Sequence, residues 1–369
     1  MDNESFFKRN YHRGLRLLFH GGRMVRLRRY RRYLRARRQL RIAEHEMAEG
    51  ILWSHAYPVY MNLDTGPVCN LRCRFCNTVN GIGNLKKELL TPDTFKRIVQ
   101  NLPLSSLYEI GLFNWGEPLL NPHLLDYIRF FARKGIRVVI HTNFSVRDHD
   151  EQFMEALILS GIAEVTVSAD GASQEVYEKY RVGGDFKRVI GNMELLAKTR
   201  RRLESDTPEI VYKMLLSRYN QHEIDDARSI SESLGVRFLV QENLGMPEQD
   251  RAEWTASQVL SKYGARPVSN ADCDVEAAVV TECRQMWDTL VVNADGAVFP
   301  CCLVCSRDSA LGNLTTQSFE DIWNGEKMRT LRAFVLDETV PAPGFPNSCA
   351  DCWFRNCLYR RQQRIITPG

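Results

Sequence analysis

The chain has 369 residues, of which 44% are hydrophobic and 25% are charged, with a net charge of +4. This length allows about two domains, and the absence of any run of about 18 apolar residues excludes a bilayer-spanning helix. The N-terminus lacks the apolar core of a secretory signal, so we expect a cytoplasmic protein. Its 11 cysteines then stay reduced and serve as metal ligands or redox groups.

Basic charge is concentrated at the N-terminus. Residues 5–43 contain 14 Lys and Arg and no acid, so the first 43 residues carry +12 and the rest of the chain −8. Apolar residues spaced among the arginines, and interrupted by Gly21-Gly22, predict two short basic helices in an extension of residues 1–50. Such a surface favours peripheral binding to an anionic membrane at its inner face. The alternative is a solvated helix packed on the protein.

Short β-rich runs alternate with helical runs from residue 57 to about 245. The expected strands are 58–63, 108–113, 137–141, 164–168, 209–216 and 237–241. The expected helices are 94–101, 123–134, 152–160, 173–180, 187–198 and 222–234. Since parallel strands need crossover helices, the pattern predicts an α/β fold, a partial (β/α)6 TIM-like barrel at residues 51–245. Its reactive groups should lie at the carboxyl ends of the strands.

The C-terminal part has a different pattern. A polar linker, residues 246–282, leads to a small α+β domain at residues 283–369. Strands at 290–293 and 297–300 should form a hairpin around Asp295-Gly296, and a helix should run from Ser318 to about Leu336.

Three cysteines follow the first expected strand, in the segment Cys69-Asn-Leu-Arg-Cys73-Arg-Phe-Cys76. A structural zinc ion takes four ligands, whereas three thiolates on a cubane iron–sulfur cluster leave one iron open. With the aromatic Phe75 before the last cysteine, this segment resembles the signature of the radical S-adenosylmethionine (SAM) superfamily. The resemblance implies that Cys69, Cys73 and Cys76 hold a 4Fe-4S cluster to which SAM binds.

The resemblance extends over residues 57–245. Trp115-Gly116-Glu117-Pro118 is similar to a Gly-Gly-Glu-Pro segment of the family, and Asn143 to its Thr-Asn-Gly position. The residues that it implies for SAM binding are Phe75, Gly116, Glu117, Asn143, Ser168, Asp170 and Arg181. Trp115 and Phe144 replace family glycines, and we expect them to pack in the core. For Asn143 and Ser168 the alternative role is a strand-end cap.

A second group of cysteines lies in the C-terminal part. With Leu311-Gly-Asn-Leu and Ser318-Phe-Glu-Asp-Ile-Trp-Asn-Gly, it resembles a SPASM domain in its reduced "twitch" form. The resemblance implies one auxiliary 4Fe-4S cluster, whose ligands would be Cys283, Cys301, Cys349 and Cys352. The remaining cysteines are Cys273, Cys302, Cys305 and Cys357. A second auxiliary cluster that uses them, or a structural zinc site, stays as an alternative.

Taken together, the resemblance implies a radical SAM oxidoreductase. SAM is cleaved reductively, with an electron from a donor such as flavodoxin or ferredoxin, and a 5′-deoxyadenosyl radical removes a hydrogen atom from the substrate. An auxiliary cluster with four protein ligands can accept an electron, which favours oxidation of a carbohydrate or cyclitol alcohol. The hydroxyl proton needs a base, and Glu242 and His141, near strand ends, are the candidates. Each could instead be an ion-paired or solvated residue.

Alternative functions remain open. Within the family, the enzyme could be an epimerase in which Cys302, Cys305 or Cys273 returns a hydrogen atom, or a maturase of ribosomal peptides. In another class, a non-catalytic protein would hold zinc and bind nucleic acid through its basic arm. The three-cysteine spacing and the Gly-Glu-Pro segment argue against that class, so we expect no nucleic-acid partner.

Overall fold

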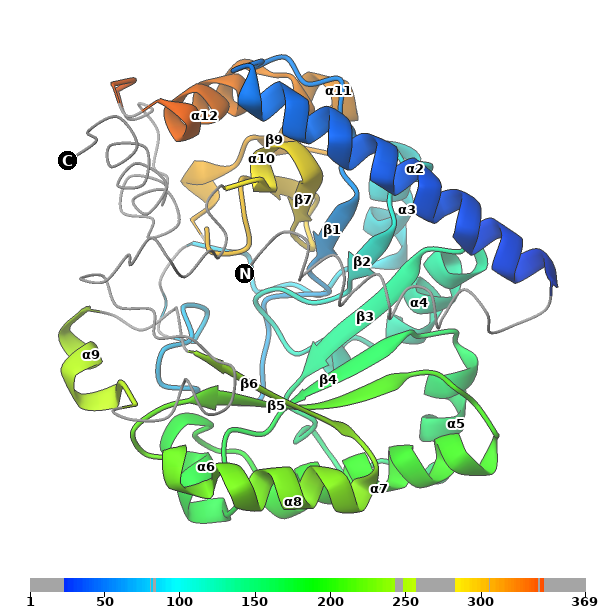
Figure 1. The fold of residues 1–369 in the computed structure, drawn as a ribbon, viewed down its shortest axis with the longest axis vertical. Coiled ribbons are helices and arrows are strands. Elements are labelled where there is room, and N and C mark those ends of the chain that lie inside the picture. The colour runs from blue at the N-terminus through cyan, green and yellow to red at the C-terminus, as the bar shows by residue number, and fades with distance from the viewer. Residues whose placement is uncertain are drawn as a thin grey trace, which may run out of the picture. The chain divides into compact units, whose positions relative to one another are not determined.

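A computed structural model describes residues 23–79, 81, 84–242, 248–256, 283–304, 306–337 and 339–341. The chain forms two compact units (Figure 1). Unit 1 comprises Met1–Asn62, Asp93–Glu109 and Ser269–Gly369, and unit 2 comprises Leu63–Pro92 and Ile110–Val268. No helix in the described part of the chain has the length and hydropathy needed to cross a membrane.

Unit 2 is built on a parallel sheet. Its strands follow in the order β6-β5-β4-β3-β2, and β3 to β6 pair in parallel. They are β2 (Glu109–Gly111), β3 (Arg137–Thr142), β4 (Glu164–Ser168), β5 (Glu209–Leu216) and β6 (Arg237–Glu242). Because β6 is an edge strand, the sheet is open, which confirms the predicted α/β fold of partial-barrel type. The predicted strand positions are close to those observed.

Helices cover one face of this sheet, and Figure 1 shows α6, α7 and α8 along the same side. The helices and turns of unit 2 are η1 (Pro118–Leu120), α4 (Leu124–Arg133), α5 (Glu151–Leu159), α6 (Gln174–Tyr180), α7 (Phe186–Arg202), η2 (Gln221–Glu223), α8 (Ile224–Leu234) and α9 (Glu248–Trp254). Four of them begin at a polar cap whose side chain accepts a backbone N–H: Glu117 for η1, Asp150 for α5, Ser173 for α6 and Asp185 for α7.

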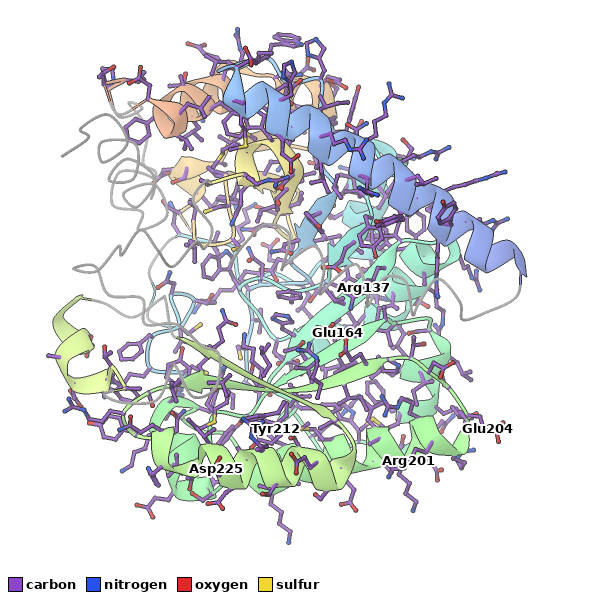
Figure 2. The ribbon with its side chains drawn as sticks, in the orientation of Figure 1. Arg137, Glu164, Arg201, Glu204, Tyr212 and Asp225 are labelled. Carbon is purple, nitrogen blue, oxygen red and sulfur yellow. The ribbon has the colours of Figure 1, made fainter. Side chains whose placement is uncertain are left out.

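The two faces of the β3–β6 sheet differ in chemistry. Alternate residues such as Val165, Val167 and Met214 are fully buried, as expected for the face under the helices. The residues between them lie on the other face, which includes apolar residues such as Val139 and Val211. We call it the polar face for its polar and charged members, which include Arg137, His141, Glu164, Thr166, Ser168, Glu209, Lys213 and Arg237. Figure 2 labels Arg137 and Glu164 on neighbouring strands of this face.

Unit 1 contains an antiparallel hairpin beside β1 (Tyr60–Leu63), in the order β1-β7-β8-β9. Its other elements are α2 (Arg23–Ala48), α3 (Pro92–Gln100), α10 (Gln285–Asp288), β7 (Thr289–Val292), β8 (Ala297–Phe299), η3 (Arg307–Ser309), β9 (Gly312–Asn313), α11 (Phe319–Trp323) and α12 (Glu326–Leu336). The predicted hairpin is confirmed, and it turns at Gly296, whose φ of 84° favours glycine.

Two predicted helices differ from those observed. The helix expected from Ser318 to Leu336 is broken into α11 and α12 at Gly325, where an added Cβ would lie 2.4 Å from the Asp321 carbonyl oxygen. The second N-terminal helix is not short, because α2 begins after Gly21-Gly22 and continues for 26 residues through helix-forming residues to Ala48. The first N-terminal helix falls outside the described residues.

The helix α2 packs on unit 1 along one side. Ala36, Leu40 and Ala43 are buried there, and the Arg32 guanidinium donates to the carbonyl oxygens of Leu104 and Leu107. One side of α2 therefore packs on the protein, which was the alternative to membrane binding in the sequence analysis. This packing does not account for the other side of the helix.

Candidate cofactor site

The loop that carries Cys69, Cys73 and Cys76 begins directly after β1. At its start Asp64 is fully buried, and its carboxylate accepts the backbone N–H of Gly66 at 3.2 Å and of Trp115 at 3.3 Å. Burial raises the pKa of Asp64 to about 6, while the backbone donors act in the opposite direction. This carboxylate therefore joins the cysteine loop to the loop after β2.

The two loops approach each other too closely for a side chain at Gly116. A Cβ there would lie 1.7 Å from the Gly66 carbonyl oxygen. The next residue, Glu117, donates its backbone N–H to the Val68 carbonyl oxygen at 2.8 Å. Glycine at position 116 is thus required by packing, since any Cβ would push the cysteine loop away.

Glu117 connects the loop after β2 to the end of β3. Its carboxylate accepts the Thr142 hydroxyl at 2.6 Å, the Asn143 N–H at 2.7 Å and the Leu119 N–H at 3.1 Å. Burial raises the pKa of Glu117 to about 7, although the hydrogen bonds from these donors act to lower it. A carboxylate has about four acceptor positions, and the donors among the described residues occupy two on Oε1 and one on Oε2.

Asn143 directs its side chain at the cysteine loop. Its amide nitrogen donates to the Cys69 sulfur at 3.6 Å and to Asn70 Oδ1 at 2.9 Å, and the Leu71 N–H also donates to the Cys69 sulfur, at 3.4 Å. Hydrogen bonds to sulfur tune the potential of a cluster. The position predicted as a SAM contact therefore touches a predicted cluster ligand.

The structure also brings together Asp170 and Arg181. The Asp170 carboxylate accepts the Arg181 Nε–H at 2.5 Å and the Leu215 N–H at 2.6 Å. A second guanidinium nitrogen of Arg181 lies 3.6 Å from the Cys73 sulfur. Burial would lower the pKa of Arg181, but Asp170 and the Cys73 thiolate hold it well above its ordinary value. A fixed cation thus lies beside the cysteine loop.

Phe75 lies in an aromatic cluster. Its ring centroid is 5.1 Å from that of Trp254 and 5.9 Å from that of Tyr180. Backbone hydrogen bonds from Arg72 N–H to Val182 and from Arg74 N–H to Tyr180 attach the cysteine loop to the end of α6 and the residues after it. These contacts hold the loop in place, and its predicted contact with SAM stays a prediction.

The chemistry of the three thiols fits an iron–sulfur cluster. Burial raises the pKa of Cys69 to about 12, and charge on Cys73, Cys76 and Glu117 adds to that effect. Burial also raises the pKa of Cys73, although Arg181 opposes the shift. Thiolates this close to one another need positive charge to ionise, which iron supplies. Among the described residues, no three His, Cys, Asp or Glu side chains converge as ligands of a single ion.

Two predicted residues, His141 and Ser168, lie on the polar face, and a third, Glu242, is the last residue of β6 at a register position of the opposite face. The His141 ring stacks on Phe113 at 3.8 Å, and burial, with Lys213 as a second cause, lowers its pKa to about 3. Ser168 pairs in register with Lys213. Glu242 pairs in register with Leu216, and its side chain is outside those that the structure describes.

Sequence reasoning missed Lys213 and Asp64. The signal for Lys213 was a lysine inside the apolar run Ile210-Val-Tyr-Lys-Met-Leu215, which on a strand places it among buried neighbours. Asp64 directly follows the first strand, where a polar residue marks the reactive edge of a parallel sheet.

The auxiliary site is described in part, within unit 1. Cys301 follows β8 and is buried, while Cys283 precedes α10 and is half-buried. Burial raises the pKa of Cys302, although a hydrogen bond from Gln285 acts to lower it. The other C-terminal cysteines, Cys273, Cys305, Cys349, Cys352 and Cys357, lie outside the described residues.

Comparisons with known proteins agree with this geometry. Residues 63–226 match the family model of the radical SAM superfamily, and residues 283–353 match that of SPASM, an iron–sulfur cluster-binding domain. The AdoMet-dependent heme synthase of Methanosarcina barkeri is 25% identical over 72% of this chain and 82% of that enzyme. The GTP 3′,8-cyclase of Alkaliphilus oremlandii is 26% identical over 55% of this chain and 61% of that enzyme, which is less than two thirds of its length.

Solved structures share the fold. Streptococcus suis SuiB superposes with a TM-score of 0.59 and 13% identity, over 75% of this chain and 68% of SuiB. The structure of anSMEcpe with bound AdoMet has a TM-score of 0.53 and 18% identity, over 81% of this chain and 88% of that protein.

Proposed function

On the premise that this chain belongs to the radical SAM superfamily and carries a C-terminal SPASM domain, we propose that it oxidises an alcohol of a carbohydrate or cyclitol. As a radical SAM enzyme with a SPASM domain, it binds SAM, a 4Fe-4S cluster for SAM and an auxiliary iron–sulfur cluster. The observation that carries the proposal is the polar face, because its hydroxyl, imidazole and ammonium groups suit a polyhydroxylated substrate.

Cys69, Cys73 and Cys76 would hold the cluster to which SAM binds. When bound, cluster and SAM supply the reductive cleavage and the hydrogen-atom abstraction. The protein's own groups prepare the site: Asn143 and the Leu71 N–H donate to the Cys69 sulfur, and Arg181 offsets the charge on Cys73.

The two candidate proton acceptors differ. The pKa of His141 is about 3, lowered mainly by burial, so its imidazole is neutral at pH 7 and disfavours a second proton. It can accept a hydrogen bond from a substrate hydroxyl but is a weak base. We therefore propose Glu242, at the end of β6, as the acceptor of the hydroxyl proton. Cys283 and Cys301 would serve the auxiliary cluster that accepts the remaining electron.

A deuterium experiment tests this proposal. Reduced, cluster-loaded protein is supplied with SAM and a panel of perdeuterated sugars and cyclitols. We expect deuterium in 5′-deoxyadenosine and one carbonyl product for each SAM consumed. An epimerase would return solvent hydrogen to the substrate without forming a carbonyl, and a peptide maturase would leave every polyol unchanged; either result would overturn the proposal.

We further propose that α2 binds an anionic membrane through the side that does not pack on unit 1. On this side Tyr30 and Leu34 are 47% and 45% exposed, and Arg31, Arg35 and Arg38 are exposed around them. Exposed apolar side chains among arginines suit the boundary between anionic headgroups and acyl chains, where each arginine contributes about 1 kcal/mol.

Liposome co-sedimentation tests the membrane proposal. We expect the full chain to bind vesicles containing phosphatidylserine but not neutral vesicles, and to lose binding at about 0.5 M salt. Replacing Arg31, Arg35 and Arg38 by Gln should weaken binding about 100-fold, whereas replacing the inward-facing Gln39 by Ala should not. Equal binding of the triple variant, or its preferential loss of nucleic-acid binding, would contradict the proposal.

A further inference from the structure

Asp64 has a buried carboxyl group that the mechanism does not use. It directly follows β1, five positions before Cys69, and is 0% exposed. Among the described residues its partners are backbone N–H groups rather than cations: those of Gly66 at 3.2 Å and Trp115 at 3.3 Å, with that of Gly116 as a further donor. A polar group removed from water needs such partners, because their loss leaves it unsatisfied.

The turn that Asp64 opens is fixed on its other side. The Thr65 carbonyl oxygen accepts the Leu90 N–H at 3.0 Å and the Asn121 side-chain amide at 2.8 Å. Gly66 has a φ of 140°, and a Cβ there would lie 2.9 Å from the backbone of a neighbouring segment. This turn therefore has few alternative positions, so the carboxylate of Asp64 can fix the loop that it binds.

Asp64 also belongs to a ring of contacts around the cysteine loop. It accepts the Trp115 N–H, and two positions later the Glu117 carboxylate accepts the Asn143 N–H at 2.7 Å. The Asn143 side chain in turn donates to the Cys69 sulfur at 3.6 Å. The residues predicted to hold the cluster and SAM thus lie on one ring, in which Asp64 links the start of the cysteine loop to the loop after β2.

We propose that Asp64 is a positioning residue for SAM binding, which holds the cysteine loop and the loop after β2 at the spacing that one SAM molecule requires. The open iron would lie at the first loop and the predicted contact of Glu117 at the second, so SAM has to reach both. When the loops are held before SAM arrives, less free energy is lost in ordering them. The inference concerns the cofactor, so it holds whichever substrate is oxidised.

Hydrogen–deuterium exchange tests the link without turnover. In the cluster-loaded full chain without SAM, peptides covering residues 64–68 and 113–117 should contain slowly exchanging amides. Asp64→Asn keeps the shape of the side chain but directs an N–H group at a backbone donor, so exchange in both peptides should rise about tenfold. Asp126→Asn, at the exposed pair with Arg129, is the matched control and should exchange as the parent does. Fast exchange of both peptides in the parent overturns the proposal.

A SAM titration separates positioning from general stability. The electron paramagnetic resonance signal of the reduced cluster gives the dissociation constant of SAM. Asp64→Asn should raise this constant about tenfold, as expected for loss of a hydrogen bond to a charged group, whereas its spectrum at saturating SAM should match that of the parent. If the variant only unfolds at lower urea concentration and its folded fraction binds SAM as the parent does, Asp64 has a structural role alone and the proposal is wrong.

A second variant covers the case in which Asp64→Asn does not fold. Asp64→Ser keeps an acceptor whose hydroxyl can rotate away from the backbone donors, and the same two measurements then decide. Failure of this inference leaves the proposed alcohol oxidation intact, because the deuterium experiment measures that reaction on the parent protein.

Discussion

The two cysteine regions have different surroundings. In unit 2, the Cys69 sulfur accepts from Asn143 and the Leu71 N–H, and Arg181 reaches Cys73. In unit 1, Cys301 follows β8, all of whose residues are buried and apolar, and Val304 shortly after it is 2% exposed. The first region thus has two hydrogen-bond donors to Cys69 and a guanidinium beside Cys73, whereas the strand that precedes Cys301 is buried and apolar.

This difference agrees with two different tasks. A cluster that binds a charged cofactor needs donors and fixed charges near its open iron, whereas a cluster that only exchanges electrons needs insulation from water. The comparison leads us to expect that changes in the two regions affect different measurements.

The largest expected effect is the loss of SAM cleavage on substitution in the unit 2 cysteine region. Cys73→Ala should reduce release of 5′-deoxyadenosine from SAM to the background, at least about 100-fold, because a cluster ligand and the partner of Arg181 are lost together. Anaerobic assays with chromatographic detection measure this product. Cys302→Ala, at a cysteine predicted to be spare, is the control and should cleave SAM at the parent rate. If Cys73→Ala cleaves SAM at the parent rate, the comparison of the two cysteine regions has no basis.

A substitution in the unit 1 cysteine region should leave SAM cleavage intact. In Cys301→Ala we expect iron to fall from about eight to about four per chain, by loss of one four-iron cluster. Oxidised product should fall more than about tenfold while 5′-deoxyadenosine is still formed. Iron analysis and product quantification on one sample test this. Should both products decline in parallel, the two regions do not have separate tasks.

The pH dependence of folding stability extends the comparison of the two units to their buried carboxylates. In unit 1, burial raises the pKa of Asp288 to about 6, although Arg284 opposes the shift. The folded state therefore binds its proton more tightly than the unfolded state, so stability falls as pH rises from about 4 to about 6, by up to about 3 kcal/mol. Asp288→Asn should abolish this decline.

Urea unfolding of the anaerobic protein between pH 4 and 7 measures the effect. The matched control is Asp126→Asn, at an exposed pair with Arg129, which should change stability by less than about 1 kcal/mol. Glu164 in unit 2 has a lowered pKa and the opposite sign, so its contribution is present above about pH 4.5 and lost toward pH 2. An unchanged slope in Asp288→Asn would show that another group titrates.

The smallest expected effect concerns hydrogen bonds to sulfur. Asn143→Leu removes a donor to Cys69 and should slow SAM cleavage about tenfold, as expected for loss of one bond to a charged acceptor. Gln285→Leu removes the hydrogen bond to Cys302 in unit 1 and should leave cleavage unchanged. Comparable losses in both variants would mean that polarity near sulfur does not distinguish the regions.

Local patterns predicted much of this molecule. Alternating apolar residues and crossover helices identified β3 to β6, and cysteine spacing identified the loop after β1, because both signals lie within a few neighbouring residues. The break at Gly325 was missed, since the need for glycine there arises from the carbonyl of Asp321 as α11 ends.

The sequence by itself determined which strands form, and which cysteines and strand-end residues could serve the cofactors. Only the tertiary structure decided which charges pair. Arg181 meets Asp170 and Cys73, and Glu117 holds the end of β3. The reason is physical: these contacts join residues 11 to 108 positions apart, so they depend on strand register and loop approach, which local preferences do not specify.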